Sequence, residues 1–213
     1  MDFTNKTVLI VGASGALGQE FCRQLSLRGA RLIGTAQTNE TAQNLNYCEQ
    51  RLLLNLMDSN SIEAVANYLN ENYQLNGVVN AAGLVAFGPA VELPLTSVEI
   101  LNRVNFSGPV ALLMRLKTNL EKASESFVLN VTGIVAQTPM PNMSHYSASK
   151  SAIHGFLSAV MREWRRSGIK VVSSLLGHTE TGLSSRPISG VAPSLPTGLT
   201  PEQAVSEMID SLG

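Results

Sequence analysis

The chain has 213 residues, of which 44% are hydrophobic and 15% charged, and its formal net charge is −1. This composition predicts one compact domain over residues 1–213 with a single continuous core. A charge balance so close to neutral argues against binding to nucleic acid or to an anionic membrane surface. No apolar run reaches the roughly 20 residues of a membrane-spanning helix, and no signal-peptide pattern opens the chain. We therefore expect a cytoplasmic protein.

Cysteine and histidine usage predicts no metal site. Cys22 and Cys48 have neither metal-site nor disulfide spacing, so we expect two reduced thiols in the core. The three histidines, His145, His154 and His178, are too scattered to form a metal site.

Short apolar runs alternate with helical patterns along the chain. The runs predict strands at Thr7–Val11, Ala30–Thr35, Arg51–Leu54, Gly77–Asn80, Ser126–Val131 and Lys170–Leu176. The helical patterns cover Ala16–Arg28, Thr41–Leu45, Ser59–Asn70, Ser97–Ala123 and Ser144–Ser167, with a break expected near Gly108. Continuously apolar strands are typical of parallel sheets buried on both faces. The order predicts an α/β fold, a doubly wound parallel sheet of about six strands with helices on both faces.

The last thirty residues have a different composition. Pro187, Pro193 and Pro196 stand among serines and glycines, which predicts a mobile loop over residues 183–199. Thr200 as N-cap and Pro201 at the first helical position then start a last helix over 201–212.

A glycine-rich loop, Gly12-x-x-Gly15-x-x-Gly18, stands between the first strand and the first helix. Glycines permit a tight turn and a close approach of the backbone to a diphosphate. The following helix offers free N–H groups and the positive end of its dipole. An ordinary turn is the alternative, but a second strand follows the loop as in Rossmann folds, so the loop predicts dinucleotide binding.

Tyr146 and Lys150 lie four residues apart in a predicted helix. Residues at this spacing share a face, so the ammonium group can lie beside the phenol. A nearby cation favours phenolate, and we expect it to lower the pKa of Tyr146 from about 10 towards neutrality. Such a phenol would suit general acid–base catalysis.

With these motifs the chain resembles the short-chain dehydrogenase/reductase family over roughly residues 6–182. Up to about residue 85 it is most similar to β-ketoacyl-acyl carrier protein reductases, in the segments Val11–Ser14, Arg28–Ala30, Ile33–Ala36 and Asn80–Gly83. Asn105, the pair Tyr146 and Lys150, and Thr181 match further positions of the family.

The resemblance implies an NAD(P)(H)-dependent oxidoreductase that transfers a hydride between a nicotinamide cofactor and a carbonyl or alcohol substrate. Tyr146 would be the general acid/base, Lys150 would hold the ribose hydroxyls and keep the Tyr146 pKa low, and Asn105 would anchor a proton-supplying water. His145 and His178 would flank the nicotinamide pocket as wall or surface residues. No metal is implied. The implied cofactor-binding residues are Gly12, Ser14, Gly15, Leu17, Gly18, Asn55, Leu56, Asn80, Ala81, Gly83, Tyr146, Lys150 and Thr181.

The end of the second strand bears on the choice between NAD(H) and NADP(H). NAD-preferring relatives place an acid there to hold the ribose 2′-hydroxyl. Thr35–Gln37 contains no acid, and the first one is Glu40. A 2′-phosphate would meet no repulsion, which favours NADP(H), although Gly15 stands where NADP-preferring relatives often carry a base.

One position departs from the family. Its members carry a serine 13 residues before the tyrosine, and here that position is Gly133. Adjacent strand residues face opposite sides, so Thr132 could replace the serine only if a bulge re-aims it. Asn142 and Ser144 are other candidate donors, and Ser144 is also a candidate helix cap.

Three hypotheses follow from this departure. The first is an NADP(H)-dependent carbonyl reductase or alcohol dehydrogenase that acts on a small, largely apolar substrate. The second is a nucleotide-binding regulatory or weakly active protein that lacks the usual serine. The third is an epimerase or dehydratase that retains its cofactor.

The helix over Asn105–Leu120 is apolar nearly all round. This predicts burial on two sides, as in the dimerising helix pair of the family, and we expect a homodimer or homotetramer. We expect the sixth strand to be covered by the loop at 184–199 or to form an edge.

Overall fold

The computed structural model describes residues 1–213 and contains one sheet of six parallel strands. Their order across the sheet is β3-β2-β1-β4-β5-β6, which confirms the predicted doubly wound α/β fold. The predicted strand ends are correct to within two residues. The strands are β1 (Thr7–Val11), β2 (Arg31–Ala36), β3 (Gln50–Leu53), β4 (Gly77–Asn80), β5 (Ser126–Val131) and β6 (Ile169–Ser174).

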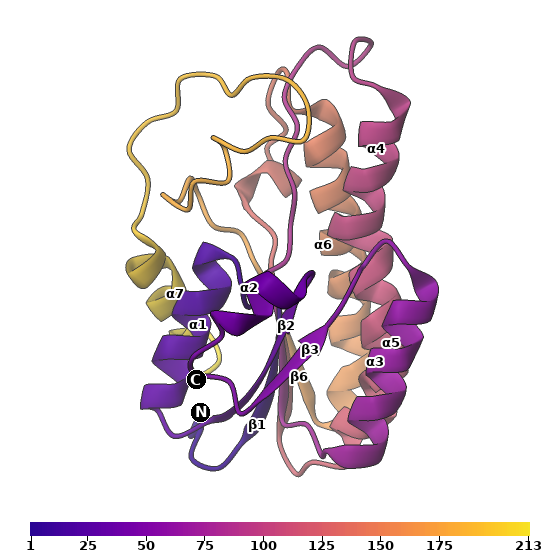
Figure 1. Cartoon of the computed structure of the whole chain (residues 1–213), viewed down its shortest axis with the longest axis vertical. Helices are drawn as coiled ribbons and strands as arrows, with labels where there is room; N and C mark the ends of the chain where they lie inside the picture. Colours follow the sequence, from indigo (N-terminus) through magenta and orange to yellow (C-terminus); the bar gives the residue numbers. More distant parts are fainter.

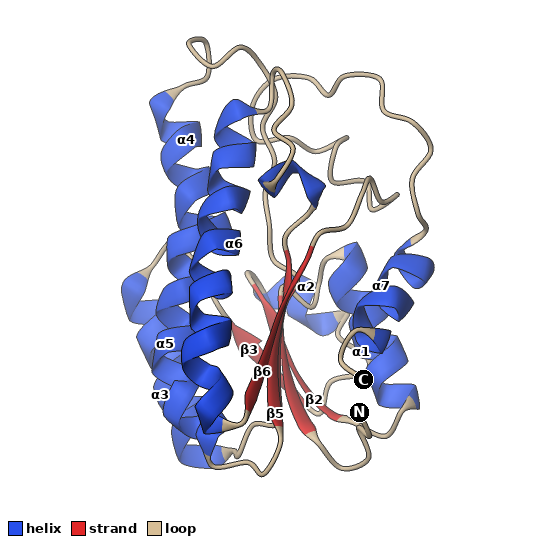
Figure 2. Ribbon diagram, turned by 180° about the vertical axis from the view of Figure 1, so that it is seen from behind, coloured by secondary structure: helices blue, strands red, loops and turns tan.

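Helices cover both faces of this sheet (Figure 1, Figure 2). On one face lie α1 (Ala16–Leu27) and α7 (Pro201–Asp210), and the short α2 (Asn39–Gln43) follows β2. The other face is covered by α3 (Ser59–Asn72), α4 (Leu95–Asn102), α5 (Gly108–Glu121) and α6 (Ser144–Trp164). None of these helices combines the length and apolarity needed to cross a membrane.

The core has two halves because successive strand residues face opposite sides of the sheet. Val78 and Val128 pack towards α3, α5 and α6, whereas Val79 and Leu129 pack towards α1 and α7. Both faces of the central strands are therefore buried, which explains why their sequences are apolar without alternation.

The predicted helix break near Gly108 is wrong. A π-helical turn at Arg103–Ser107 joins α4 directly to α5. Pro109 lies in the first turn of α5, where a missing N–H is tolerated best. The π turn contains the buried Asn105, and such turns occur frequently at functional sites.

The segment 183–199 arches over the carboxyl ends of the strands (Figure 1). It is fastened at one end by the bonds Ile188 N to Val85 O and Phe87 N to Ser189 O, and at the other by Leu199 N to His178 O. It forms no strand beside β6, which remains an edge strand. Thr200 is the N-cap of α7 and Pro201 its first residue, as predicted, and Gln203 completes a capping box; the helix ends at Asp210, two residues earlier than expected.

Candidate active site

A pocket of about 470 Å³ lies at the carboxyl ends of β1, β4, β5 and β6, where doubly wound sheets bind their ligands. Segments 15–17, 81–85, 131–135 and 176–179 contribute to its wall. Tyr146 and Lys150 of α6 and Thr181 also line it. The fold thus brings the glycine-rich loop and the Tyr146–Lys150 pair, which are far apart in sequence, to one pocket.

The glycine-rich loop is shaped by backbone contacts that exclude side chains. Gly12 has φ +75°, and a Cβ on Gly18 would lie 2.1 Å from the carbonyl oxygen of Gly12. Gly15 is the N-cap of α1 and no side chain caps this helix, so its first N–H groups are available to an anion. Gly15 and Leu17 line the pocket, while Gly12, Ser14 and Gly18 set the course of the loop behind it.

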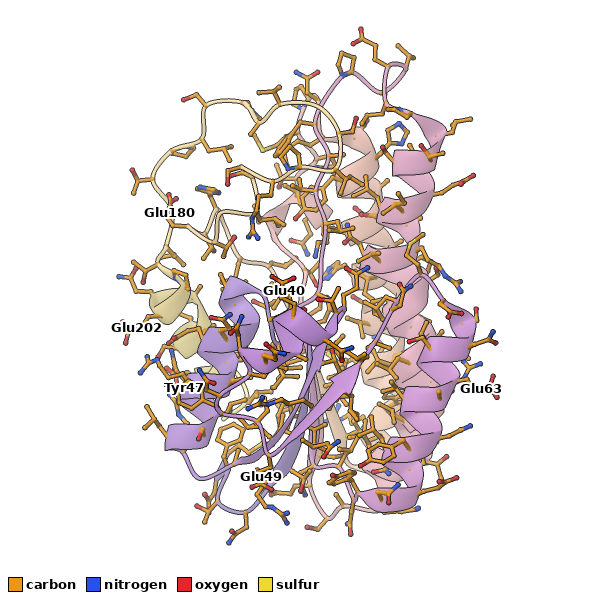
Figure 3. All side chains as sticks on the ribbon, viewed as in Figure 1. Glu40, Tyr47, Glu49, Glu63, Glu180 and Glu202 are labelled. Atoms are coloured by element: carbon orange, nitrogen blue, oxygen red, sulfur yellow. The ribbon has the colours of Figure 1, made fainter.

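The residues expected near the adenosine lie outside the pocket. Asn55 accepts a hydrogen bond from Met57 N through Oδ1, and Leu56 is a core residue. At the end of β2, the hydroxyl of Thr35 accepts a bond of 3.1 Å from Gly12 N and so ties this strand to the glycine-rich loop. Glu40, the first acid after β2, lies on α2 (Figure 3).

Asn80 ends β4 with its side chain buried. Its Nδ2 donates to Asn130 Oδ1 over 2.6 Å, but its own Oδ1 is buried without a partner. Ala81 and Gly83, which follow it, line the pocket. Asn80 itself does not line the pocket, but its unpaired Oδ1 carries a desolvation cost that a polar partner would relieve. Together with the uncapped α1, this site fits a nucleotide.

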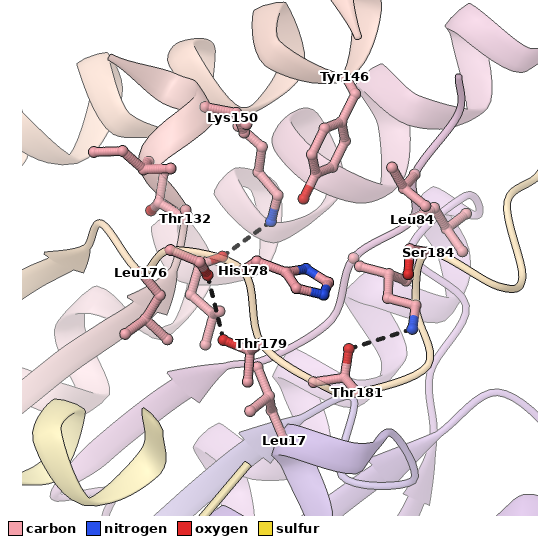
Figure 4. Close-up of a pocket in the computed structure, with 18 of the residues that line it drawn as sticks. Leu17, Leu84, Thr132, Tyr146, Lys150, Leu176, His178, Thr179, Thr181 and Ser184 are labelled. Carbon is pink, nitrogen blue, oxygen red and sulfur yellow. Dashed lines mark hydrogen bonds between the residues drawn. The ribbon is translucent and has the colours of Figure 1, made fainter. Parts of the chain in front are cut away.

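Tyr146 and Lys150 both point into the pocket (Figure 4). Lys150 Nζ donates to the carbonyl oxygen of Val131 over 2.9 Å and lies 5.9 Å from the centroid of the Tyr146 ring. Although part of the Tyr146 ring is accessible from the pocket, burial raises the pKa of Tyr146 to about 12. Burial also lowers the pKa of Lys150 to about 8.

The expectation that Lys150 lowers the pKa of Tyr146 is therefore wrong for this structure. Burial removes the phenol from water and so raises its pKa, because desolvation disfavours the charged form. At neutral pH Tyr146 is a protonated phenol that can donate its proton.

Asn105 does not line the pocket, but its side chain holds segments of the pocket wall in place through hydrogen bonds. Its Oδ1 accepts from Leu84 N over 2.8 Å, and its Nδ2 donates to Leu84 O and to Ser149 Oγ. Ser149 in turn donates to the carbonyl oxygen of Tyr146 over 2.7 Å. Asn105 therefore connects the wall at Leu84 to the helix that carries Tyr146. No sequence motif indicated a role for Ser149. Its position in the same helical turn as Tyr146 and Lys150 was the only sign that it could lie near the site.

Gly133 leaves the wall beside β5 without a side chain. Its backbone, at φ +97° and ψ 150°, adopts a conformation that is essentially limited to glycine. The preceding Thr132 is not re-aimed towards Tyr146: its buried hydroxyl accepts from Asn130 Nδ2 over 2.8 Å and pairs with Ser173 Oγ at 2.6 Å. Thr132 therefore does not replace the serine.

The other candidate donors lie outside the pocket. Asn142 and Ser144 are exposed and do not line it. The N-cap of α6 is Met143, so Ser144 is not the helix cap either. His145 bonds to the carbonyl oxygen of Ala90 over 2.9 Å, away from the pocket. His178 lines the pocket, as expected.

Two further polar residues line the pocket, Ser184 and Arg186, and the sequence did not indicate either of them as a hydrogen-bond donor to a ligand. Arg186 donates to the carbonyl oxygens of Gly182 and Thr181. Both residues belong to the segment after β6. The sequence of this segment has no periodic pattern from which its path over the pocket could be predicted.

Comparisons with known proteins identify similar chains. The model of the family described as short chain dehydrogenase matches residues 6–189. The NADPH-dependent 1-acyldihydroxyacetone phosphate reductase of Schizosaccharomyces pombe is 28% identical over 187 residues, which are 86% of this chain and 63% of that protein. The 3-oxoacyl-[acyl-carrier-protein] reductase of Escherichia coli is 26% identical over 207 residues, which cover 93% of this chain and 85% of the relative.

Solved structures share the fold. A short-chain dehydrogenase from Burkholderia cenocepacia in complex with NADP superposes with a TM-score of 0.88 at 20% identity, over 100% of this chain and 86% of that one. One from Sphingobium yanoikuyae in complex with NADPH gives 0.89 at 23% identity, over 97% and 84% of the two chains.

The lowered pKa of Lys150 predicts a pH dependence of stability. Between pH 8 and 10.5 the unfolded chain holds a proton on Lys150 that the folded chain has lost, so this group makes the free energy of unfolding rise with pH in this window. The raised pKa values of Cys22 and Tyr146 act in the opposite sense, so the contribution of Lys150 is read as a difference. We expect the free energy of unfolding from urea denaturation, relative to that of Lys150→Met, to rise by about 1 kcal/mol per pH unit in the wild type. The exposed Lys122→Met should show the same rise; parallel wild-type and Lys150→Met curves would contradict the burial of this ammonium.

Proposed function

Because this chain belongs to the short-chain dehydrogenase family, whose members are NAD(P)-dependent dehydrogenases and reductases, we propose that it reduces a carbonyl compound with a nicotinamide cofactor, using Tyr146 as the proton donor. One observation carries the proposal. The phenol of Tyr146 and the amine of Lys150 face the same pocket as the uncapped start of α1. The chain spans 63% of the length of the first relative above, so the activity of that whole protein is not carried over.

The residues of the glycine-rich loop would hold the diphosphate of the cofactor through their N–H groups. Ala81 and Gly83 would pack on the adenosine ribose, Lys150 would bind the hydroxyls of the other ribose, and Thr181 would bind the carboxamide. When bound, the nicotinamide supplies the hydride that reduces the carbonyl carbon.

Tyr146 would donate its O–H proton to the carbonyl oxygen as the carbon is reduced. The phenol is protonated at neutral pH and can therefore act as the donor. A charged Lys150 would then stabilise the phenolate that remains, and its pKa near 8 allows it to return a proton. Asn105 would keep α6 and the wall at Leu84 at a fixed separation, and we propose that it also anchors the water that resupplies protons.

A second candidate function rests on Gly133. A chain without a hydroxyl at this position would bind the nucleotide but turn over slowly or not at all, and would act as a regulatory protein. Loss of one donor to the reacting oxygen costs about 10²–10³ in rate.

Tyr146→Phe separates the two functions. We expect the kcat of this variant, measured by NADPH oxidation with a panel of ketones and aldehydes, to be at least 10²-fold lower than that of the wild type, because the variant lacks the proton donor. Its affinity for NADPH should stay within about threefold of the wild type. The exposed Tyr68→Phe on α3 serves as the control. Equal activity of the wild type and Tyr146→Phe, or no turnover by the wild type, would favour the regulatory protein.

We propose NADP(H) rather than NAD(H) as the cofactor. The end of β2 bears no acid: Ala36 is buried, and the exposed Gln37 follows it. The relative from Schizosaccharomyces pombe is named as NADPH-dependent, which supports the proposal.

Gln37→Asp tests this preference. A carboxylate beside the ribose would repel the 2′-phosphate, and we expect NADPH to bind at least tenfold more weakly, roughly 1.4 kcal/mol, while NADH binds equally well or better. Fluorescence titration of both cofactors measures this, with the exposed Gln43→Asp on α2 as control. Wild-type protein that binds NADH as tightly as NADPH would refute the preference.

We also propose that the chain forms a homodimer through α5. Phe106, Val110 and Met114 follow one another at intervals of four residues and so share a face of the continuous helix. Phe106 and Val110 are half-buried, and Met114 is 63% exposed. Met161 on α6 is a second exposed methionine in this helical layer.

Met114→Glu should convert the dimer to a monomer, because it would bury a charge in an apolar interface. Sedimentation velocity measures the change. Leu27→Glu, at an equally exposed position on α1, should leave the dimer intact. A monomeric wild type would exclude this interface.

A further inference from the structure

Few polar side chains of the pocket are free to bind a reacting oxygen beside Tyr146. Gly133 has none, and the hydroxyl of Thr132 is engaged by Asn130 and Ser173. Thr179 donates to the carbonyl oxygen of Gly177, and Thr181 Oγ1 accepts from Leu183 N. The hydroxyl proton of Thr181 is assigned to the carboxamide in the proposed function, and Arg186 donates to the carbonyl oxygens of Gly182 and Thr181. The side chains that then remain are those of His178 and Ser184.

His178 belongs to the segment that borders the space beside Gly133. A Cβ on Gly133 would lie 3.7 Å from the carbonyl oxygen of Leu176, and His178 is two residues further along. Figure 4 shows its imidazole ring between the Tyr146–Lys150 pair and Thr181. Ser184 lies on another side of the pocket, near Leu84. Because His178 lies on the segment that borders Gly133, its imidazole is the stronger candidate to replace the absent side chain.

Glu180 and Gly198 restrict the position of the His178 ring. Its Nε2 lies 3.4 Å from Glu180 Oε1, and the same carboxylate oxygen accepts from Gly198 N over 2.9 Å. A Cβ on Gly198 would come within 2.8 Å of His178 Cδ2, so the glycine makes room for this edge of the ring. The backbone is fixed by the bond from Leu199 N to His178 O. Nδ1 is left as the ring nitrogen without a polar partner.

We propose that His178 is a catalytic residue that carries a proton on each ring nitrogen: Nε2–H faces Glu180, and Nδ1–H donates a hydrogen bond to the carbonyl oxygen of the substrate in place of the absent serine hydroxyl. This rests on the proposed function. In the reduction, a C–H bond forms at the carbonyl carbon at the expense of the C=O π bond, and the cofactor is oxidised as the substrate is reduced. The Tyr146 O–H proton moves to the oxygen, while the imidazole N–H donates without transferring its proton. Such a bond strengthens as negative charge develops on the oxygen.

His178→Ala tests the proposal against a structural role. We expect kcat to fall by roughly 10²–10³, as for other donors to a developing oxyanion, with NADPH affinity within about twofold of the wild type. His178→Gln keeps an N–H donor, and its kcat should be at least tenfold higher than that of His178→Ala. His145→Ala, which lies outside the pocket, should behave as the wild type.

Three results would overturn the assignment. The first is a His178→Ala kcat within about threefold of the wild type while Tyr146→Phe is inactive, which leaves the proposed function standing. The second is equal loss in His178→Ala and His178→Gln together with weaker NADPH binding, which indicates a structural role. The third is a loss of kcat in Ser184→Ala but not in His178→Ala. A wild type that binds NADPH and turns over no carbonyl compound removes both this inference and the proposed function.

Discussion

The hydrogen bond from Lys150 Nζ to the carbonyl oxygen of Val131 is the contact on which the site depends. It joins α6 to the carboxyl end of β5 inside the pocket, where an amine without a partner would carry a large desolvation cost. Burial keeps this amine close to its titration point and the neighbouring phenol protonated. The same burial thus makes the pair costly to fold and sets the pKa values of both groups.

The framework around this contact is predictable from sequence because it follows from local rules. Continuous apolar runs at β1, β4 and β5 indicated buried parallel strands, and their order with the helices indicated a doubly wound sheet. Its strand ends meet at one edge, so the glycine-rich loop after β1 and the helix after β5 had to approach each other. Periodicity and spacing carry this information directly.

Other features of the site depend on tertiary contacts that no spacing encodes. The helix continued through a π turn at Arg103–Ser107, where the sequence suggested a break, because Asn105 bonds inward to Leu84 and Ser149. The pKa of Tyr146 was predicted from its neighbour in sequence, but the enclosing walls determine it. Those walls include the segment after β6, which is fastened by backbone bonds to Val85, Phe87 and His178 rather than by any side-chain pattern.

The ends of β4, β5 and β6 explain why the missing hydroxyl was not replaced from the sheet itself. Asn80 bonds to Asn130, Asn130 to Thr132, Thr132 to Ser173, and Ser173 to His154 on α6. Turning the Thr132 hydroxyl into the pocket would leave the buried Nδ2 of Asn130 without its acceptor and would cost Ser173 one of its two side-chain partners, and an unpaired buried donor carries a desolvation cost. The strand ends therefore bond to one another, and Gly133 turns the chain away in a conformation closed to serine. If the proposed function holds, the segment after β6, where His178 lies, is the place from which a donor to the reacting oxygen can come.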